Sequence, residues 1–274
     1  MKYATHYIKE YIKFSEKSRK ITCVGVFFCI FACEMTDEKK IIITVGTEYM
    51  HFTVTETDGT TTEHKYTIDN KMSVAANLRE VFRKQSYMKA AKRTPDGIPC
   101  IRATLMVSTP VVLVPIEEDF EPKSSYDIAI TGYKYDNKHV TEIPLLDAVA
   151  IYPVNNDLKM VVEDNCSDVE VGNIIIPVWQ TLYKKYYTGT QDRNLFVYFF
   201  DGKMNICYFE HHRFRYANSF EVTKVEDMMY YILYVWKQLG MNATADILSL
   251  CGDIPDTLEE KLKVYIERVT ECEL

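Results

Sequence analysis

The chain has 274 residues, of which 47% are hydrophobic and 26% are charged, so it can bury a core and is not dominated by disorder. Its formal charge of −7 argues against nucleic acid as a partner, because phosphate binding draws on clustered lysine and arginine. The eight cysteines show neither Cys-x-x-Cys spacing nor a zinc-site pattern, which predicts reduced, structural thiols in a cytoplasmic protein.

Residues 1–34 precede the first clear strand and leave three interpretations open. A basic start is followed by an apolar run over residues 21–33, which is shorter than the roughly 20 residues that span a bilayer as a helix. The run fits a signal peptide, and residues 30–33 resemble a lipoprotein cleavage box. The sequence from Met35 instead looks like a cytosolic start, which makes residues 1–34 an extension from a misplaced start codon. The third interpretation is a native helix.

The apolar pattern predicts a series of strands followed by a helix in the first half of the chain. We expect strands over residues 41–47, 49–56 and 60–66, then a helix capped by Ser73 with Val74, Leu78, Val81 and Phe82 on one face, then strands over residues 101–107 and 111–114. Asp58-Gly59 supplies a hairpin turn between the second and third strands.

The same order returns toward the C-terminus. We expect strands over residues 195–200, 203–209 and 214–220, a helix over 225–239, a strand over 247–251 and a last amphipathic helix over 258–269. Between the halves the pattern predicts a strand over 148–152, a helix over 156–164, a strand over 169–176 and a helix over 178–187. Thr223 and Glu226 have the spacing of a capping box, with Thr223 as the N-cap.

Strands that alternate with helices imply parallel pairing and right-handed crossovers. Three antiparallel strands followed by helix, strand and helix, occurring twice, is the order of the ribonuclease-H-like unit that is duplicated in actin-like proteins. We therefore expect an α/β chain with a duplicated ribonuclease-H-like, actin-like ATPase fold. Residues 35–144 would form the first lobe and residues 145–274 the second, each with a mixed sheet flanked by helices.

The C-terminal half also resembles a specific family. The residues that carry the resemblance are Asn218-Ser219-Phe220, Glu226-Asp227, Tyr230-Tyr231, Leu233, Gln238-Leu239, Leu248, Leu250 and Gly252. They are similar to a family of Bacteroidetes proteins, the domain of unknown function DUF3822, for which an actin-like ATPase fold is known. The likeness extends from about residue 145 to the end and more weakly over residues 41–115. It implies the fold and no function.

Active actin-like ATPases use an Asp-x-Gly-Thr/Ser-type turn between the first two strands of each half, where glycine admits the phosphates and the aspartate organises the hydrated metal ion. The first such turn here keeps Gly46 and Thr47 but has Thr44 in the position of the aspartate. The second, Asp201-Gly202, has the right residue types at hairpin length, and Asp-Gly is an ordinary hairpin signal. We therefore expect degenerate phosphate turns, no catalytic or metal-binding residues, and neither ATP nor magnesium as a cofactor.

We hypothesise that five residues in the second half form a special surface or cleft: Asn218, Phe220, Glu226, Asp227 and Tyr231. The alternative is that they are fold determinants, because Asn218 can end a strand, Phe220 lies near a helix entry and Glu226 can complete a cap.

Three functional hypotheses follow. The favoured one is a non-catalytic actin-like protein that acts through another protein or through self-association, since its phosphate turns are degenerate. The second is a nucleotide-binding ATPase with divergent phosphate loops. The third is an envelope-associated lipoprotein. No transmembrane span and no nucleic acid partner are expected.

Overall fold

The computed structural model describes residues 38–90, 97, 99–115, 137–186, 193–210 and 213–274, so residues 1–34 and their three interpretations lie outside it. The strands are β1 (Lys39–Val45), β2 (Tyr49–Thr55), β3 (Thr61–Thr67), β4 (Ile101–Val107), β5 (Val112–Pro115), β6 (Lys138–Ile143), β7 (Ala148–Pro153), β8 (Asp168–Asn173), β9 (Asn194–Phe200), β10 (Lys203–Glu210), β11 (Arg213–Glu221), β12 (Ile247–Gly252) and β13 (Val269–Cys272). The helices are α2 (Val74–Lys84), α4 (Asn156–Glu163), α5 (Ile175–Tyr186), α6 (Val225–Gln238) and α7 (Leu258–Leu262), with 3-10 turns η2 (Ser86–Met88) and η3 (Pro144–Leu146).

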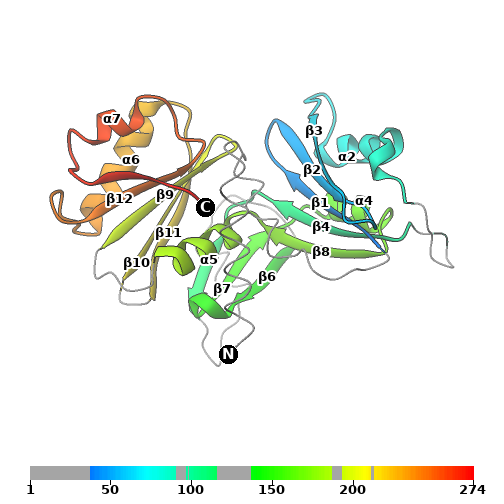
Figure 1. Ribbon diagram of the computed structural model, residues 1–274, viewed down its shortest axis with the longest axis horizontal. Helices are drawn as coiled ribbons and strands as arrows, with labels where there is room; N and C mark the ends of the chain where they lie inside the picture. Colours follow the sequence, from blue (N-terminus) through cyan, green and yellow to red (C-terminus); the bar gives the residue numbers. More distant parts are fainter. Residues whose placement is uncertain (1–37, 91–96, 98, 116–136, 187–192, 211–212) are drawn as a thin grey trace.

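Two five-stranded sheets repeat the same strand order. The first runs β3-β2-β1-β4-β8 and the second β11-β10-β9-β12-β13. In both, the first three strands pair antiparallel and the last three pair parallel. Each lobe therefore has the same unit, with α2 or α6 following its third strand (Figure 1). The predicted duplicated α/β, actin-like fold is confirmed.

The first lobe is longer in sequence than the predicted division suggests. Strand β8 pairs with β4, so the first sheet takes its last strand from beyond residue 144. Between β4 and α4 the chain also forms a small third sheet, β5-β7-β6, which the sequence pattern did not indicate as a separate sheet. Strand pairing thus divides the lobes between β8 and α5, and the predicted division at residues 144 and 145 does not coincide with it.

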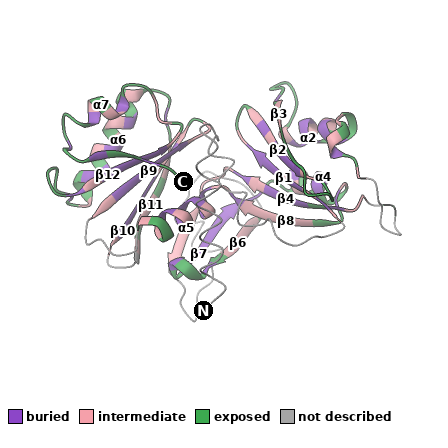
Figure 2. Ribbon diagram, in the orientation of Figure 1, coloured by how far each residue is buried: buried purple, intermediate pink, exposed green. Residues whose placement is uncertain are grey.

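The core has two main parts, and they use opposite faces of the second sheet. The larger part contains residues of the first sheet, α2, α4 and α5, together with Phe196, Tyr198 and Phe209 of the second sheet. The smaller part packs α6 and α7 against the other face, around Leu195 and Leu250. Buried positions accordingly follow the strands of both lobes in Figure 2. Because α5 belongs to the larger part, the two lobes share a continuous apolar core.

Helix α6 begins one residue later than its predicted capping box. Its N-cap is Lys224, which makes no side-chain capping hydrogen bond. Glu226 instead accepts a hydrogen bond from Lys261 of the neighbouring α7 segment at 2.8 Å. The prediction that Thr223 caps this helix is therefore wrong, because a tertiary partner takes the carboxylate. The predicted cap of α2 is confirmed, since Ala76 N donates to Ser73 Oγ at 3.1 Å.

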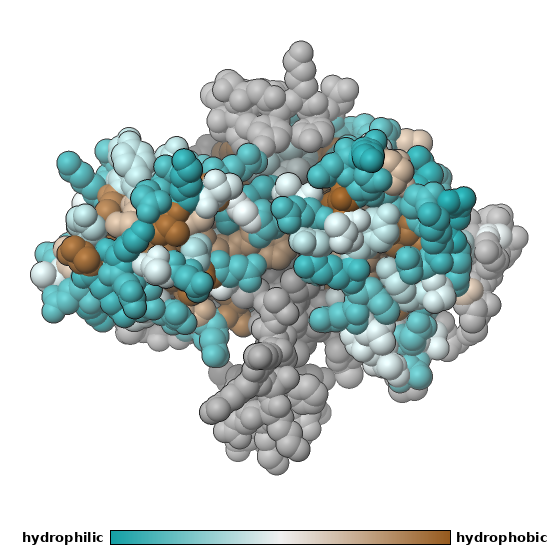
Figure 3. Space-filling model, turned by 90° about the horizontal axis from the view of Figure 1, so that it is seen from above, coloured by the Kyte–Doolittle hydropathy of each residue, from teal (hydrophilic) through white to brown (hydrophobic). Residues whose placement is uncertain are grey.

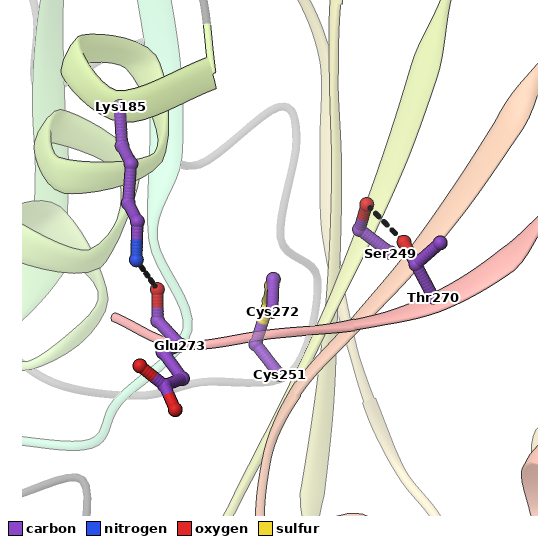
Figure 4. Close-up of a disulfide and its surroundings, with 6 residues drawn as sticks. All are labelled: Lys185, Ser249, Cys251, Thr270, Cys272 and Glu273. Carbon is purple, nitrogen blue, oxygen red and sulfur yellow. Dashed lines mark hydrogen bonds between the residues drawn. A yellow bond between two sulfur atoms is a disulfide. The ribbon is translucent and has the colours of Figure 1, made fainter.

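The last predicted helix ends early, at Leu262, and a short strand begins at its last predicted residue, Val269. Helix α7 stops at Leu262, and Val269 lies in β13, opposite Leu248 of β12. The same pairing places Cys272 opposite Cys251, and the two form a disulfide with their Cα atoms 5.0 Å apart (Figure 4). The prediction of reduced thiols is therefore wrong for this pair, because the fifth strand brings them together. Cys166 and Cys207 are free and buried.

The visible surface is mainly hydrophilic, with separate apolar groups among polar residues (Figure 3). Within the described ranges, none of the helices combines the length and apolar character needed to cross a bilayer.

Candidate functional site

The two turns that correspond to phosphate turns lie at equivalent places in the two lobes. The first connects β1 to β2 and contains Gly46 and Thr47, and the second connects β9 to β10 and contains Asp201 and Gly202. Asp201 has φ 53° and Gly202 has φ 69°. Two successive positive φ values belong to the two-residue turn that matches the twist of a β-hairpin, and aspartate and glycine tolerate them best. The second turn is therefore a tight hairpin turn, as its length indicated.

These two turns contact each other across the lobes. Thr47 donates its backbone N–H to Asp201 Oδ2 at 2.6 Å and its hydroxyl to the same oxygen at 2.9 Å. A Cβ atom added at Gly46 would lie 2.8 Å from Asp201 Oδ1. Gly46 is thus required for the close approach of a carboxylate rather than for a positive φ. We call Gly46, Thr47 and Asp201 the cross-lobe clamp.

A second contact between the lobes lies beside the clamp. The Lys203 ammonium donates to the carbonyl oxygen of Ser108 and lies 3.2 Å from its hydroxyl. Ser108 directly follows β4, and the neighbouring Asn173 amide donates to Thr109 O at 2.8 Å. Lys203 and Asp201 thus both reach from the second lobe to the ends of first-lobe strands, which fixes the two turns in register with each other.

A small cavity of about 20 Å³ adjoins Lys203 and is also lined by Trp179 and Asn218. The Trp179 side chain is 4% exposed, and its Nε1 is buried with no hydrogen-bond partner in the part of the chain that the structure describes. The volume suits one water molecule rather than a nucleotide. A larger, mostly apolar cavity of about 380 Å³ lies between the first sheet, α5 and β9, where Thr44 and Phe200 line it and no clamp residue does.

The side chains that could serve in acid–base or metal chemistry are the titratable groups around the clamp, of which His51 has a shifted pKa. His51 lies on β2, and burial first, then Lys65, lower the pKa of its imidazole, while Asp201 acts in the opposite direction. A lowered pKa keeps this ring neutral at pH 7. Across the described ranges, no group of three or more His, Cys, Asp or Glu side chains is placed to hold a metal ion.

The five predicted surface residues divide into an aromatic group and a polar group. Phe220 of β11 stacks on Tyr231 of α6, with ring centroids 4.6 Å apart. Tyr230 adjoins Tyr231 at 5.3 Å and stacks on Tyr234 at 6.1 Å. Tyr230 is 62% exposed and Tyr234 is 50% exposed. Together with Tyr216, which lies on the same strand as Phe220, these residues form what we call the aromatic surface.

The polar members lie around this surface in different ways. Asn218 is exposed on β11 and accepts a hydrogen bond from Ser219 N at 2.8 Å. Asp227 is exposed in the first turn of α6. Glu226 is paired with Lys261, whose hydrogen bond lowers the pKa of the carboxyl group. Sequence reasoning missed Tyr234, although its position four residues after Tyr230 on a helix was the signal for a shared exposed face.

Comparison with known proteins assigns the family. A family model described as "Protein of unknown function (DUF3822)" matches residues 31–269. The chain belongs to the DUF3822 family. A search of the curated proteins gave no match.

Among solved structures, this DUF3822 chain is similar to a Bacteroides thetaiotaomicron protein with an actin-like ATPase fold and unknown function. The TM-score is 0.73 at 22% identity, covering 86% of this chain and 91% of the other. Weaker likenesses include a PilM–PilN type IV pilus biogenesis complex (TM-score 0.49, 7% identity, 88% and 89% coverage) and the AlfA filament from a B. subtilis plasmid (TM-score 0.39, 7% identity, 86% and 92% coverage). The likeness to the Bacteroides thetaiotaomicron protein shows the fold alone.

A groove of about 470 Å³ in the DUF3822 chain lies between two strands that end their sheets. It is lined by Val112, Val114 and their neighbours on β5 and by residues 214–218 of β11. In the described ranges, β5 pairs only with β7 and β11 only with β10. Sequence reasoning could not place this groove, because β5 belongs to the third sheet and β11 to the second lobe.

Proposed function

We propose that this protein is a non-catalytic actin-like protein that acts by binding another protein. The single observation that carries the proposal is the cross-lobe clamp, in which Asp201 Oδ2 accepts hydrogen bonds from the backbone N–H and the hydroxyl of Thr47. These are the kinds of donor that a phosphate oxygen uses when it binds to a turn. In this chain a carboxylate of the opposite lobe takes them.

The clamp and a nucleotide would compete for the same place. A triphosphate at the first turn would need the donors of Thr47 and would bring its negative charge against the Asp201 carboxylate. The first turn also carries Thr44 where an active ATPase carries the metal-organising aspartate, and Thr44 is buried. Phosphoryl transfer depends on placed charge and metal ions, so these features support a role without turnover.

Two lobes that share contacts and a core are suited to presenting a surface to a partner. The clamp and the Lys203–Ser108 contact hold the lobes together at one end, and the shared apolar core joins them through α5. Function would then reside in an exposed site rather than in the cleft.

The experiment is a thermal unfolding series of the purified chain with magnesium and millimolar ATP, ADP or GTP. We expect the melting temperature to stay within one degree of the ligand-free value. A ligand at 100 times its Kd stabilises a protein by about 2.7 kcal/mol. For a chain of this size that corresponds to roughly 5–11 °C, and a shift of that order with any of the three nucleotides would overturn the proposal.

A further inference from the structure

We propose that the free edge of β3 pairs with the β3 edge of a second copy of this chain, antiparallel and centred on His64, so that two first sheets become one continuous sheet. This goes beyond the proposed function and holds whether or not the chain binds a nucleotide, because it concerns how copies assemble.

Strand β3 offers an open and regular edge. It is the outermost strand of the first sheet and pairs, within the described ranges, only with β2 (Figure 1). Its residues keep one uninterrupted register with β2, from Thr61 opposite Thr55 to Thr67 opposite Tyr49. By contrast, the register of β11 shifts, and β5 and β13 have four residues each. Bulges, prolines and short strands are devices that prevent edge pairing, and β3 has none of them.

The backbone groups of β3 that face outward follow from the two ends of its pairing with β2. Glu56 N donates to Thr60 O at 2.9 Å, and Ile68 N donates to Glu48 O at 2.8 Å. Hydrogen-bonded residues alternate along an antiparallel pair, so the even-numbered residues of β3 bond to β2. The odd-numbered residues therefore direct their N–H and C=O groups to the free edge, and these are Thr61, Glu63, Lys65 and Thr67.

The charges on β3 select a second copy as the occupant of this edge. A two-fold axis through His64 places Glu63 opposite Lys65 of the second copy, and the symmetry gives the same pair again on the other side of the axis. Both side chains are exposed. Glu63 has no ion-pair partner in the part of the chain that the structure describes, and the Lys65 ammonium lies 3.5 Å from the centroid of the Tyr49 ring. Opposite charges placed in this way stabilise a strand pair.

The neighbouring registers are less favourable. An axis through Glu63 would place two glutamates directly opposite each other, and an axis through Lys65 would do the same with two lysines, which destabilises a strand pair. Either shift would also leave an outward-facing residue at one end of β3 without an opposite residue. The axis through His64 lets every outward-facing residue of both copies pair, so charge and backbone hydrogen bonding favour the same register.

The other face of the strand fits the same register. Thr62 would lie opposite Tyr66 of the second copy, which is a β-branched–aromatic pair. At the centre, the His64 ring stacks on Tyr87 of its own chain with centroids 3.8 Å apart, and its Nε2 lies 3.1 Å from Thr62 Oγ1. A side chain that is already held in place loses little conformational freedom when the edges meet.

The experiment measures the self-association of the full chain by sedimentation velocity. We expect a monomer–dimer equilibrium with a Kd in the micromolar range, about 1–100 µM, because one strand edge is a smaller interface than that of a permanent dimer. The measurements are made in 0.15 M salt, where the screening length is about 8 Å. The formal charge of −7 on each copy then repels weakly, whereas charges in contact still attract.

Reversing one charge at a time tests the register. Glu63→Lys alone places lysines opposite each other, and Lys65→Glu alone places glutamates opposite each other, so each variant should dimerise roughly tenfold or more weakly. An equimolar mixture of these two variants should recover the affinity of the natural chain, because a copy with two lysines then faces a copy with two glutamates. Native mass spectrometry identifies this mixed dimer by its mass.

A matched control reverses a charge at another sheet edge. Glu271→Lys lies on β13, the outermost strand of the second sheet, and it should change the Kd less than twofold. Circular dichroism and the melting temperature establish that each variant is folded.

Three results would each overturn the proposal: a natural chain that stays monomeric across the concentration range, single variants that dimerise as tightly as the natural chain or more tightly, or a mixture of the two variants that stays monomeric. None of them bears on the cross-lobe clamp, whereas a nucleotide-induced thermal shift would overturn the proposed function whatever the oligomeric state.

Discussion

Substituting Gly46 by alanine tests the cross-lobe clamp, because its effect should depend on a residue in the other lobe. A Cβ at this position would lie 2.8 Å from Asp201 Oδ1 and 3.0 Å from Cγ and Oδ2, so the carboxylate must move. Moving it breaks the two hydrogen bonds from Thr47. At about 1 kcal/mol net for each hydrogen bond, Gly46→Ala should cost about 2 kcal/mol.

The same substitution should be harmless once the carboxylate is gone. Asp201→Gly removes the side chain, and glycine accepts the φ of 53° at this position. In that background Gly46→Ala should be neutral or stabilising by about 0.5 kcal/mol, because alanine reduces the freedom of the unfolded chain. The coupling energy between the two sites is then about 2 kcal/mol, which is about 4–8 °C in melting temperature for a chain of this size.

Thermal unfolding followed by tryptophan fluorescence and circular dichroism measures all four proteins of this double-mutant cycle. The two single variants, the double variant and the natural chain are compared at the same pH and salt concentration. If Gly46→Ala lowers the melting temperature equally with and without Asp201, the turns do not touch in solution, and the reasoning that places a carboxylate in the phosphate position is refuted.

Three further predictions concern the cysteines and histidines. Peptide mapping without reductant should recover the Cys251–Cys272 disulfide, and Cys251→Ser with Cys272→Ser should lower the free energy of unfolding by about 3 kcal/mol, since the bond joins residues 21 apart in sequence. Burial raises the pKa of the Cys166 thiol to about 12, so at pH 8 iodoacetamide should label it at least a hundredfold more slowly than free cysteine, measured by mass spectrometry. Burial lowers the pKa of His51 and His139 below 6.5 in the folded chain, so the unfolded chain binds more protons below that pH and stability falls. The urea midpoint should therefore drop between pH 7.5 and pH 5.5, and less so in the His51→Asn, His139→Asn variant.

The strand order could be predicted from the sequence because local signals and tertiary context agree in most elements. The strand predicted over residues 101–107 has those bounds in the structure, since its apolar and β-branched residues are buried in the middle of the first sheet. The α2 helix has a cap, Ser73, and a single apolar face. Where propensity, period and capping point to the same element, one sequence is enough to place it.

Prediction failed where a distant partner decided between two local possibilities. Leu258, Leu262 and Val269 fit one helical face, and all three are buried, but Val269 completes the second sheet beside Leu248. The sequence has the helical spacing, and the three residues are buried as that spacing predicts. The backbone at Val269 is nevertheless extended, because it pairs with β12 as the fifth strand of the sheet. The Cys251–Cys272 bond was hidden for the same reason, because only β13 brings the two thiols together.

In the candidate site, Asp201 is both a residue of a hairpin turn and a hydrogen-bond acceptor for the other lobe. Asp201-Gly202 is a hairpin turn by every local criterion, and its positive φ values fit that interpretation. The same Asp201 carboxylate also accepts hydrogen bonds from Thr47, 154 positions earlier in the chain. The residue types that favour a tight turn, a short acidic side chain and a glycine, are also those that let a carboxylate project from it. A duplicated fold places two such turns face to face, so the donors of Thr47 in the first turn lie within reach of the aspartate of the second. Gly46 leaves room for the Asp201 carboxylate and Thr47 supplies both donors, so the contact uses the two residues that the first turn shares with a phosphate turn.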